Sequence, residues 1–250
     1  MRIISILNFK GGTGKSSLAE NLSHALALHG QRVLVIDADR QGNASTTLLA
    51  KRSPHTLTQV IKEEIPLEQA IFQARENLYV VPSDSDLDKA STYLSTTPES
   101  YDTLKDAIQA LTNFDCVFID HAGAYTPVMQ AALFASGEML VPCELEPYAT
   151  QGLFSMFDKL KRTLRKHVIH NAGIIPYNVD LRYTMARRYL QEMRETFGDL
   201  ITAPIRTDST VPRAQSVRQT VFEYDPKSRV AEDFRTLAED LTTERQEASQ

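Results

Sequence analysis

The chain has 250 residues, of which 42% are hydrophobic, and carries a formal net charge of −5 at pH 7. It contains no apolar run approaching the ~20 residues of a membrane-spanning helix, which excludes a helical integral membrane protein. An acidic total also argues against nucleic-acid binding by the surface as a whole, so a surface for nucleic acid would have to be local.

Strands are predicted to alternate with helices from residue 2 to about residue 241. This order is typical of an α/β fold, with a mostly parallel, twisted sheet flanked by helices on both faces. Because no Pro/Gly/Ser-rich linker or internal repeat divides the chain, we predict one domain over residues 1–241 and a polar tail over residues 242–250. The first predicted strand, residues 1–8, leaves no room for a cleaved signal or an N-terminal helix-turn-helix.

A glycine-rich loop joins this strand to a helical pattern that begins near Lys15. Backbone N–H groups and the positive end of a helix dipole converge at such a turn and favour a bound polyphosphate. Lys15 is expected to reach the β- and γ-phosphates, while the Ser16 hydroxyl binds Mg²⁺. The predicted nucleotide-binding residues of the loop are Gly11, Gly12, Thr13, Gly14, Lys15, Ser16 and Ser17.

Two further predicted strands end in carboxylates. Residues 33–36 are followed by Asp37 and Asp39, and residues 116–119 are followed by Asp120. The carboxyl ends of adjacent parallel strands meet at the crevice where open α/β sheets bind ligands. We therefore expect these three aspartates to lie beside the glycine-rich loop.

The loop sequence K-G-G-x-G-K-[ST], residues 10–16, resembles the deviant Walker A motif of the ParA/MinD family of P-loop ATPases. The resemblance implies that Lys10 reaches the nucleotide of a partner subunit and that Asp120 is the Walker B aspartate, which holds Mg²⁺ through water. It further implies that Asp37 lies near the metal and that Asp39 orients the attacking water. The expected catalytic residues are Lys10, Lys15 and Asp39, and the expected metal site is Ser16, Asp37 and Asp120.

Three positions depart from the family pattern. Phe9 stands where the general loop motif has its first glycine, and Arg40 replaces the proline of D-x-D-P-Q-G-N. His121-Ala122-Gly123 follows Asp120, where the family commonly has Cys-Pro-Pro. We expect the loop after Asp120 to move differently here, with His121 on its surface.

The resemblance extends to the C-terminal part of the chain. Residues 173–182 look like the strand and loop that pass the adenine in ParA proteins, and residues 221–229 are similar to their closing segment. Pro176 and Asn178 are therefore expected to contact the base.

Basic residues are concentrated in one stretch. Residues 151–230 carry 14 Lys and Arg against 8 Asp and Glu, whereas residues 231–250 carry 2 against 6. A cluster of Lys and Arg on a helix is often only a solvated face. ParA proteins without a separate DNA-binding domain, however, bind DNA nonspecifically as dimers, so the resemblance favours a phosphate-backbone footprint. The cluster over residues 159–166 contains Lys159, Lys161, Arg162, Arg165 and Lys166, and the candidate DNA contacts are Arg187, Arg188, Arg213 and Arg218.

The sequence thus predicts a Mg²⁺-dependent, ParA-like partition or positioning ATPase in the cytoplasm, associated with the nucleoid. It is expected to form an ATP-bound homodimer, to bind DNA, and to be reset by hydrolysis that a ParB-like or other cargo adaptor stimulates. A MinD-like membrane ATPase and a metabolic P-loop enzyme remain alternatives. Against the former, residues 231–250 are acidic rather than basic and amphipathic. Cys116 and Cys143 fall in predicted buried strands and do not supply the cluster ligands of an iron-protein ATPase.

Overall fold

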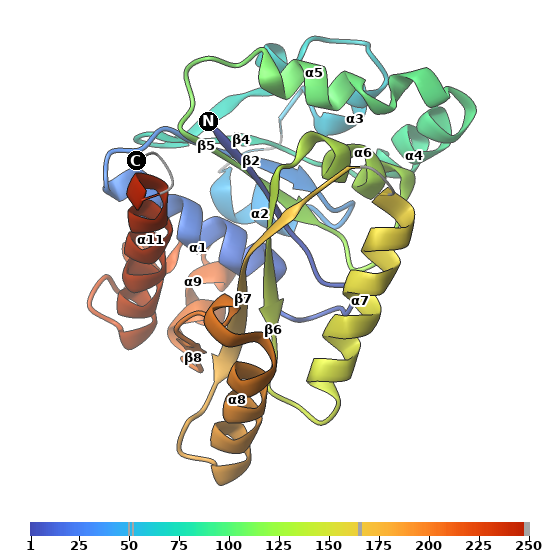
Figure 1. The fold of residues 1–250 in the computed structure, drawn as a ribbon. Helices are drawn as coiled ribbons and strands as arrows, with labels where there is room; N and C mark the ends of the chain where they lie inside the picture. Colours follow the sequence, from blue (N-terminus) through green and yellow to red (C-terminus); the bar gives the residue numbers. More distant parts are fainter. Residues whose placement is uncertain (50, 52, 165–166, 248–250) are drawn as a thin grey trace.

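A computed structural model describes residues 1–49, 51, 53–164 and 167–247 of the chain. Figure 1 shows a central twisted sheet with helices on both of its faces. The strands are β1 (Arg2–Ile6), β2 (Val33–Ala38), β3 (Phe72–Arg75), β4 (Leu78–Val81), β5 (Cys116–His121), β6 (Glu138–Cys143), β7 (His170–Val179) and β8 (Ile205–Arg206). The helices are α1 (Lys15–Leu28), α2 (Asn43–Leu48), α3 (Leu57–Ile61), α4 (Leu87–Thr96), α5 (Thr103–Gln109), α6 (Pro127–Ala135), α7 (Ala149–Leu164), α8 (Thr184–Phe197), α9 (Thr210–Ser216), α10 (Val221–Tyr224) and α11 (Arg229–Glu247). Short 3₁₀ turns are η1 (Leu67–Ala70), η2 (Pro98–Tyr101) and η3 (Gly198–Leu200).

The sheet has the strand order β3-β4-β2-β5-β1-β6-β7-β8. β3 runs antiparallel to β4 at one edge, and the other neighbouring strands are parallel. β1 lies between β5 and β6, so the loop that follows β1 leaves the middle of the sheet. This arrangement confirms the predicted α/β class.

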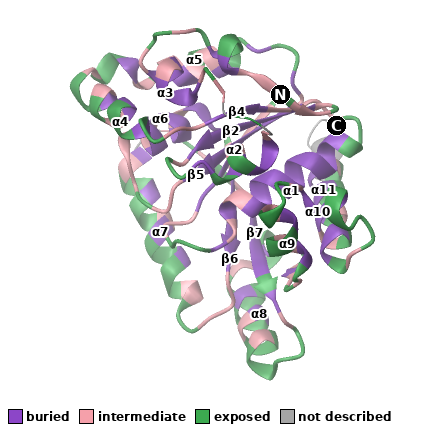
Figure 2. Cartoon of the chain, turned by 180° about the vertical axis from the view of Figure 1, so that it is seen from behind, coloured by how far each residue is buried: buried purple, intermediate pink, exposed green. Residues whose placement is uncertain are grey.

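Helices cover both faces of the sheet. Because alternate residues of each strand point to opposite faces, residues of both sets are buried. In β2, Val33 and Val35 belong to the core under α1 and α11, whereas Leu34 and Ile36 belong to the core under α3–α6. A third apolar cluster packs α7 and α8 against β6 and β7. Figure 2 shows the result, with buried strands in the centre and exposed residues on the outer helix faces.

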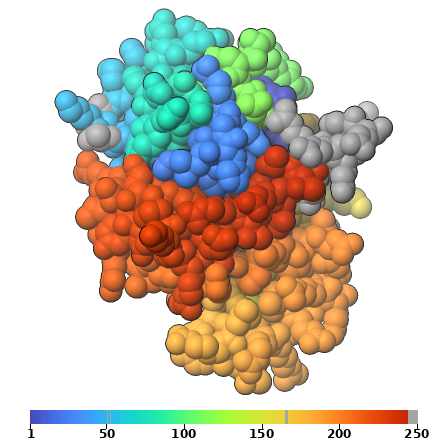
Figure 3. Space-filling view, turned by 90° about the vertical axis from the view of Figure 1, so that its left-hand side faces the viewer, coloured from blue at the N-terminus to red at the C-terminus, as the bar shows by residue number. Residues whose placement is uncertain are grey.

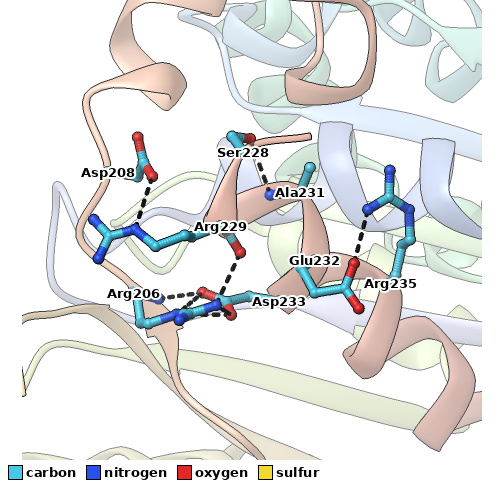
Figure 4. A network of polar contacts seen from close by, with 8 residues as sticks. All are labelled: Arg206, Asp208, Ser228, Arg229, Ala231, Glu232, Asp233 and Arg235. Atoms are coloured by element: carbon cyan, nitrogen blue, oxygen red, sulfur yellow. Dashed lines mark hydrogen bonds and ion pairs between the residues drawn. The ribbon is translucent and has the colours of Figure 1, made fainter. Parts of the chain in front are cut away.

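The C-terminal segment closes the α1 face. In Figure 3 it forms an orange and red band below the blue N-terminal segment. Arg206 of β8 donates to both carboxylate oxygens of Asp233 on α11, at 2.6 to 3.0 Å, and Arg229 lies 3.9 Å from Asp208 (Figure 4). At the other end of α11, the Leu241 carbonyl accepts a hydrogen bond from Arg2 at 2.7 Å. α11 continues to Glu247, so most of the segment expected as a polar tail is helical.

Within the described residues, no helix is both long enough and apolar enough to cross a membrane. Cys116 and Cys143 are buried in β5 and β6, as the sequence predicts.

Candidate functional site

The glycine-rich loop folds into an open cradle in front of α1. Gly12 and Gly14 have φ angles of 77° and 87°, a left-handed region that residues with a Cβ rarely adopt. Gly14 is the N-cap of α1 and therefore offers no side-chain acceptor to the first helical N–H groups. A cavity of about 470 Å³ opens over these N–H groups, and its lining includes the whole run Gly11–Ser17. The loop thus presents backbone donors and a helix dipole to an anion.

Tyr177 of β7 fixes the loop from behind, a role that the sequence analysis missed. Its hydroxyl donates to Ser17 Oγ at 2.7 Å, and its ring packs so closely on Gly14 that a Cβ there would lie 2.3 Å from a ring carbon. Gly14 is therefore required both for its left-handed φ and for the close approach of the ring. Burial raises the pKa of Tyr177, which keeps the hydroxyl protonated as a donor.

Lys15 is buried at the base of the cavity. Its Nζ donates to the Lys10 carbonyl at 3.2 Å, which curls the side chain back over the loop. Burial lowers the pKa of Lys15, and the charges of Asp120 and Asp39 oppose that shift. Lys15 is thus a cation within reach of both the loop and the aspartates, as expected for a phosphate ligand.

Asp37 and Asp39 have different surroundings. Asp37 is fully buried, and its Oδ2 accepts hydrogen bonds from the backbone N and the Oγ of Ser45 at 2.8 and 2.6 Å. Asp39 is only partly buried, lines the cavity, and accepts from the Gln41 backbone N at 2.9 Å. Asp37 is therefore held rigidly below the site, while Asp39 faces the space where a ligand would lie.

Asp120 lies beside Asp37 in the register of the neighbouring strands β5 and β2. It is fully buried, and neither carboxylate oxygen has a hydrogen-bond partner among the described residues. Burial and the Asp37 charge raise the pKa of Asp120, whereas the nearby Ser16 hydroxyl lowers it. Two neighbouring buried carboxylates, one of them with orphan oxygens, are stable as anions only near additional positive charge.

These residues fit a magnesium ion. Ser16, Asp37 and Asp120 supply hard oxygen donors, and the unpartnered oxygens of Asp120 are available to ordered water. The ion would neutralise part of the carboxylate charge and of the phosphate charge beside Lys15. The predicted metal residues therefore occupy one place, although they come from α1, β2 and β5.

Lys10 begins the glycine-rich loop and is exposed. Its Nζ lies 2.6 Å from Glu146 and 3.6 Å from Glu144, both in the loop after β6. The hydrogen bond to Glu146 is the main cause of the raised pKa of Lys10. Lys10 therefore points away from the loop of its own subunit and toward the surface.

His121 is not a surface residue, and the expectation was wrong. It is the last residue of β5, is fully buried, and its Nε2 lies 2.8 Å from Ser5 Oγ on β1. Burial lowers its pKa to about 3, so the ring is neutral. The sequence misplaced it because β5 continues two residues beyond the predicted strand. The following loop lies close to the phosphate loop, since a Cβ added to Gly123 would lie 3.5 Å from Gly11.

Glu20 is a second residue that the sequence analysis missed. It lies on α1, lines the cavity, and is fully buried, with Oε2 accepting from Gln215 of α9 at 3.2 Å. Its Oε1 has no hydrogen-bond partner among the described residues, and burial raises its pKa to about 8. Its one sequence signal is an acidic residue between the apolar residues Ala19 and Leu22 of α1.

The two expected base contacts do not line this cavity. Pro176 is buried in β7 beside Cys143 of β6, and Asn178 is exposed with a φ of 58°. Their contact with adenine stays a prediction.

The four candidate DNA-binding arginines are exposed but lie on separate elements. Arg187 and Arg188 are on α8, whereas Arg213 is on α9 and Arg218 follows it. Arg218 has a φ of 56° and lines a second, polar cavity of about 660 Å³ together with Arg40, Lys62 and Lys89. Of the basic cluster over residues 159–166, Arg165 and Lys166 lie outside the described residues.

Comparison with known proteins identifies similarity over nearly the whole chain. A family described as an AAA domain matches residues 1–184. The chromosome partitioning protein ParA of Caulobacter vibrioides is 31% identical, over 96% of this chain and 94% of that protein. The chromosome-partitioning ATPase Soj of Thermus thermophilus is 30% identical, over 99% and 98%.

Two solved structures show how widely the fold is used. Apo McdA from Cyanothece superposes with a TM-score of 0.84 at 24% identity, covering 97% of this chain and 99% of McdA. Cobyrinic acid a,c-diamide synthase from Mycobacterium smegmatis, solved with an ATP analogue and magnesium, gives 0.83 at 23% identity, over 97% and 94%.

Proposed function

Because the chain belongs to the ParA family of P-loop ATPases, we propose that it segregates or positions a cargo by cycling between a nucleotide-bound dimer and a monomer. It is an ATPase that uses ATP and Mg²⁺. The observation that carries the proposal is the similarity to ParA and Soj over nearly the whole chain. In addition, Lys10, the lysine that precedes the glycines of the loop, faces outward. The cargo is a plasmid, a chromosome or a protein assembly.

Within one subunit, we assign different residues to phosphate binding, metal binding and water orientation. The loop N–H groups and Lys15 hold the phosphates, and the Mg²⁺ bound by Ser16 and the buried aspartates neutralises charge that develops on the phosphoryl group. Asp39 is the acid placed to orient a water molecule, because it borders the cavity and is not locked by the contacts that hold Asp37.

Between subunits, Lys10 supplies the contact that makes the dimer depend on nucleotide. In the single chain its charge is held by Glu146 and Glu144 on an exposed surface, where ion pairs stabilise little. Exchanging these carboxylates for the triphosphate of a partner subunit therefore costs little and gains a stronger, charge-assisted contact. Lys10 acts as a trans-acting finger in this arrangement.

Lys10→Ala tests the dimer. We expect this variant to bind ATP with nearly the affinity of the unmodified protein but to form no ATP-dependent dimer in light scattering. Glu146→Gln is the matched control, because it removes the shorter of the two ion pairs that hold Lys10 in its own chain and should leave dimer formation intact. Normal dimers and normal turnover in Lys10→Ala would refute the role of this lysine.

DNA binding is the second part of the proposal. Closure of two subunits doubles the number of basic side chains that can face one duplex, and phosphate contacts add in the logarithm of affinity through counterion release. Nucleotide state would then switch DNA binding. An adaptor bound to the cargo would reset the switch by stimulating hydrolysis, and the protein would be found on the nucleoid.

Reversing Arg187 and Arg188 to Glu should weaken ATP-dependent binding to every duplex sequence alike. For each arginine that binds a phosphate, the substitution should reduce the slope of log affinity against log salt by about 0.9. Lys105→Glu on α5 is the control for Arg187→Glu alone, because it makes the same charge change on another helix, and it should bind as the unmodified protein does. If the unmodified protein with ATP shows no salt-sensitive DNA binding, the DNA proposal fails.

A metabolic function is the second candidate, since a synthase shares the fold. A small-molecule substrate that raises ATP turnover, in the absence of DNA and adaptor, would favour it.

A further inference from the structure

A buried chain of hydroxyl groups fixes the ring of His121. Ser136 Oγ donates to the Ala132 carbonyl at 2.9 Å, and Ser5 Oγ lies 2.7 Å from Ser136 Oγ. Because Ser136 uses its only hydrogen on Ala132, Ser5 must donate to Ser136, and His121 Nε2 must donate to Ser5 at 2.8 Å. Ser5, Ser136 and His121 are all at most 1% exposed. The hydrogen-bond directions therefore place the proton of the neutral ring on Nε2.

The other ring nitrogen is consequently a buried acceptor. His121 Nδ1 has no hydrogen-bond partner among the described residues. A buried polar atom without a partner is rare and costly in native proteins. It lies at the base of the loop over residues 122–126, which rests on the phosphate loop through Gly123 and Gly11.

Other strands of the sheet show how such an acceptor is used. At the ends of β1, β2 and β7, a side-chain oxygen accepts the backbone N–H of the residue two positions later. The pairs are Asn8 with Lys10 at 2.9 Å, Asp37 with Asp39 at 3.1 Å and Asp180 with Arg182 at 3.0 Å. These short turns set the direction in which each loop leaves its strand. Nδ1 of a histidine is as far from the backbone as Oδ1 of Asn or Asp, so His121 could accept from Gly123 in the same way.

We propose that His121 is a positioning residue, and that its Nδ1 accepts the Gly123 N–H when the loop over residues 122–126 closes on bound nucleotide. The Ser5–Ser136 chain holds the ring through Nε2 and leaves Nδ1 as its acceptor. The bond would form at β5 the same kind of turn as at the ends of β1, β2 and β7. It would fix Gly123, which lines the cavity. This inference rests on nucleotide binding at the phosphate loop.

Two substitutions separate the two ring nitrogens. His121→Asn keeps an acceptor near the position of Nδ1 but does not reach Ser5, whereas His121→Gln keeps a donor for Ser5 and loses the acceptor near the backbone. The direct measurement is hydrogen exchange of the Gly123 amide by NMR, with and without a non-hydrolysable ATP analogue and Mg²⁺. A titration of the same analogue shows independently whether nucleotide binds.

In the unmodified protein we expect the analogue to slow exchange at Gly123 by about tenfold, the effect of one hydrogen bond. His121→Asn should retain part of this protection, because it keeps the acceptor but loses the Ser5 anchor, and His121→Gln should lose all of it. The analogue affinity of both variants should stay within about threefold of that of the unmodified protein. The turnover number of His121→Gln should fall by about tenfold, without a matching rise in KM.

Four results would overturn the proposal. Equal protection of Gly123 in His121→Gln and the unmodified protein would show that Nδ1 is not the acceptor. Equal losses of Gly123 protection in both His121 variants would show that His121 acts only through packing. If neither variant folds, Ser5→Ala decides, because a ring released from Ser5 should protect Gly123 less, and unchanged protection would contradict the assignment. An analogue that does not bind the unmodified protein would instead refute the nucleotide site, and this inference with it.

Discussion

Glu20 should make the folded state less stable as the pH rises. The side chain is fully buried on α1, and burial raises its pKa from 4.5 to about 8. Between these pH values the folded state retains a proton that the unfolded chain has released. The stabilising contribution is therefore complete below pH 4.5 and is lost as the pH rises toward 8.

The size of the effect follows from the pKa difference. Each pH unit well within this window lowers the free energy of unfolding by about 1.4 kcal/mol, so a change from pH 5.5 to pH 7.5 should cost on the order of 2 to 3 kcal/mol. Glu20→Gln stays neutral over this range and keeps an acceptor for Gln215. The variant should thus become progressively more stable than the unmodified protein as the pH increases.

Urea unfolding of the nucleotide-free protein at several pH values measures this difference. Burial also raises the pKa values of Asp37 and Asp120. Their effects on the pH dependence of unfolding are present in both proteins and largely cancel when the two are compared. Glu99→Gln, an exposed substitution of the same kind, is the control. If the stabilities of Glu20→Gln and the unmodified protein change in parallel with pH, Glu20 is ionised in the fold and the reasoning is wrong.

Three further substitutions test the phosphate cradle. Lys15→Ala should abolish nucleotide binding in a titration, because the buried cation beside Asp120 is removed; near-normal affinity would contradict its role. Asp39→Ala should retain ATP but stop hydrolysis, giving a persistent ATP-bound dimer in light scattering, and unchanged turnover would move the water-orienting role elsewhere. Tyr177→Phe should lower the free energy of unfolding by about 1 kcal/mol, since only the hydrogen bond to Ser17 is removed; unchanged thermal stability would show that this bond contributes nothing.

The sequence by itself determined the parts of the site that depend on local patterns. The phosphate loop can be predicted from the sequence because its glycines, its lysines and the following helix are contiguous. The positions of Asp37 and Asp120 in the site can be predicted because each residue ends an apolar run. Parallel strands bring such ends to one edge of the sheet. The α/β class follows for the same reason, from the alternation of strands and helices.

Only the tertiary structure decided which distant side chains complete the site. Tyr177 donates to Ser17 from 160 residues away, and its ring also packs on Gly14. Lys10 forms an ion pair with Glu146 in the loop after β6. His121 presents Nδ1 as a buried acceptor because its Nε2 is hydrogen-bonded to Ser5 of β1. Burial and hydrogen-bond direction depend on which elements pack together, and a residue's chemistry in the fold follows from those neighbours rather than from its own stretch of sequence.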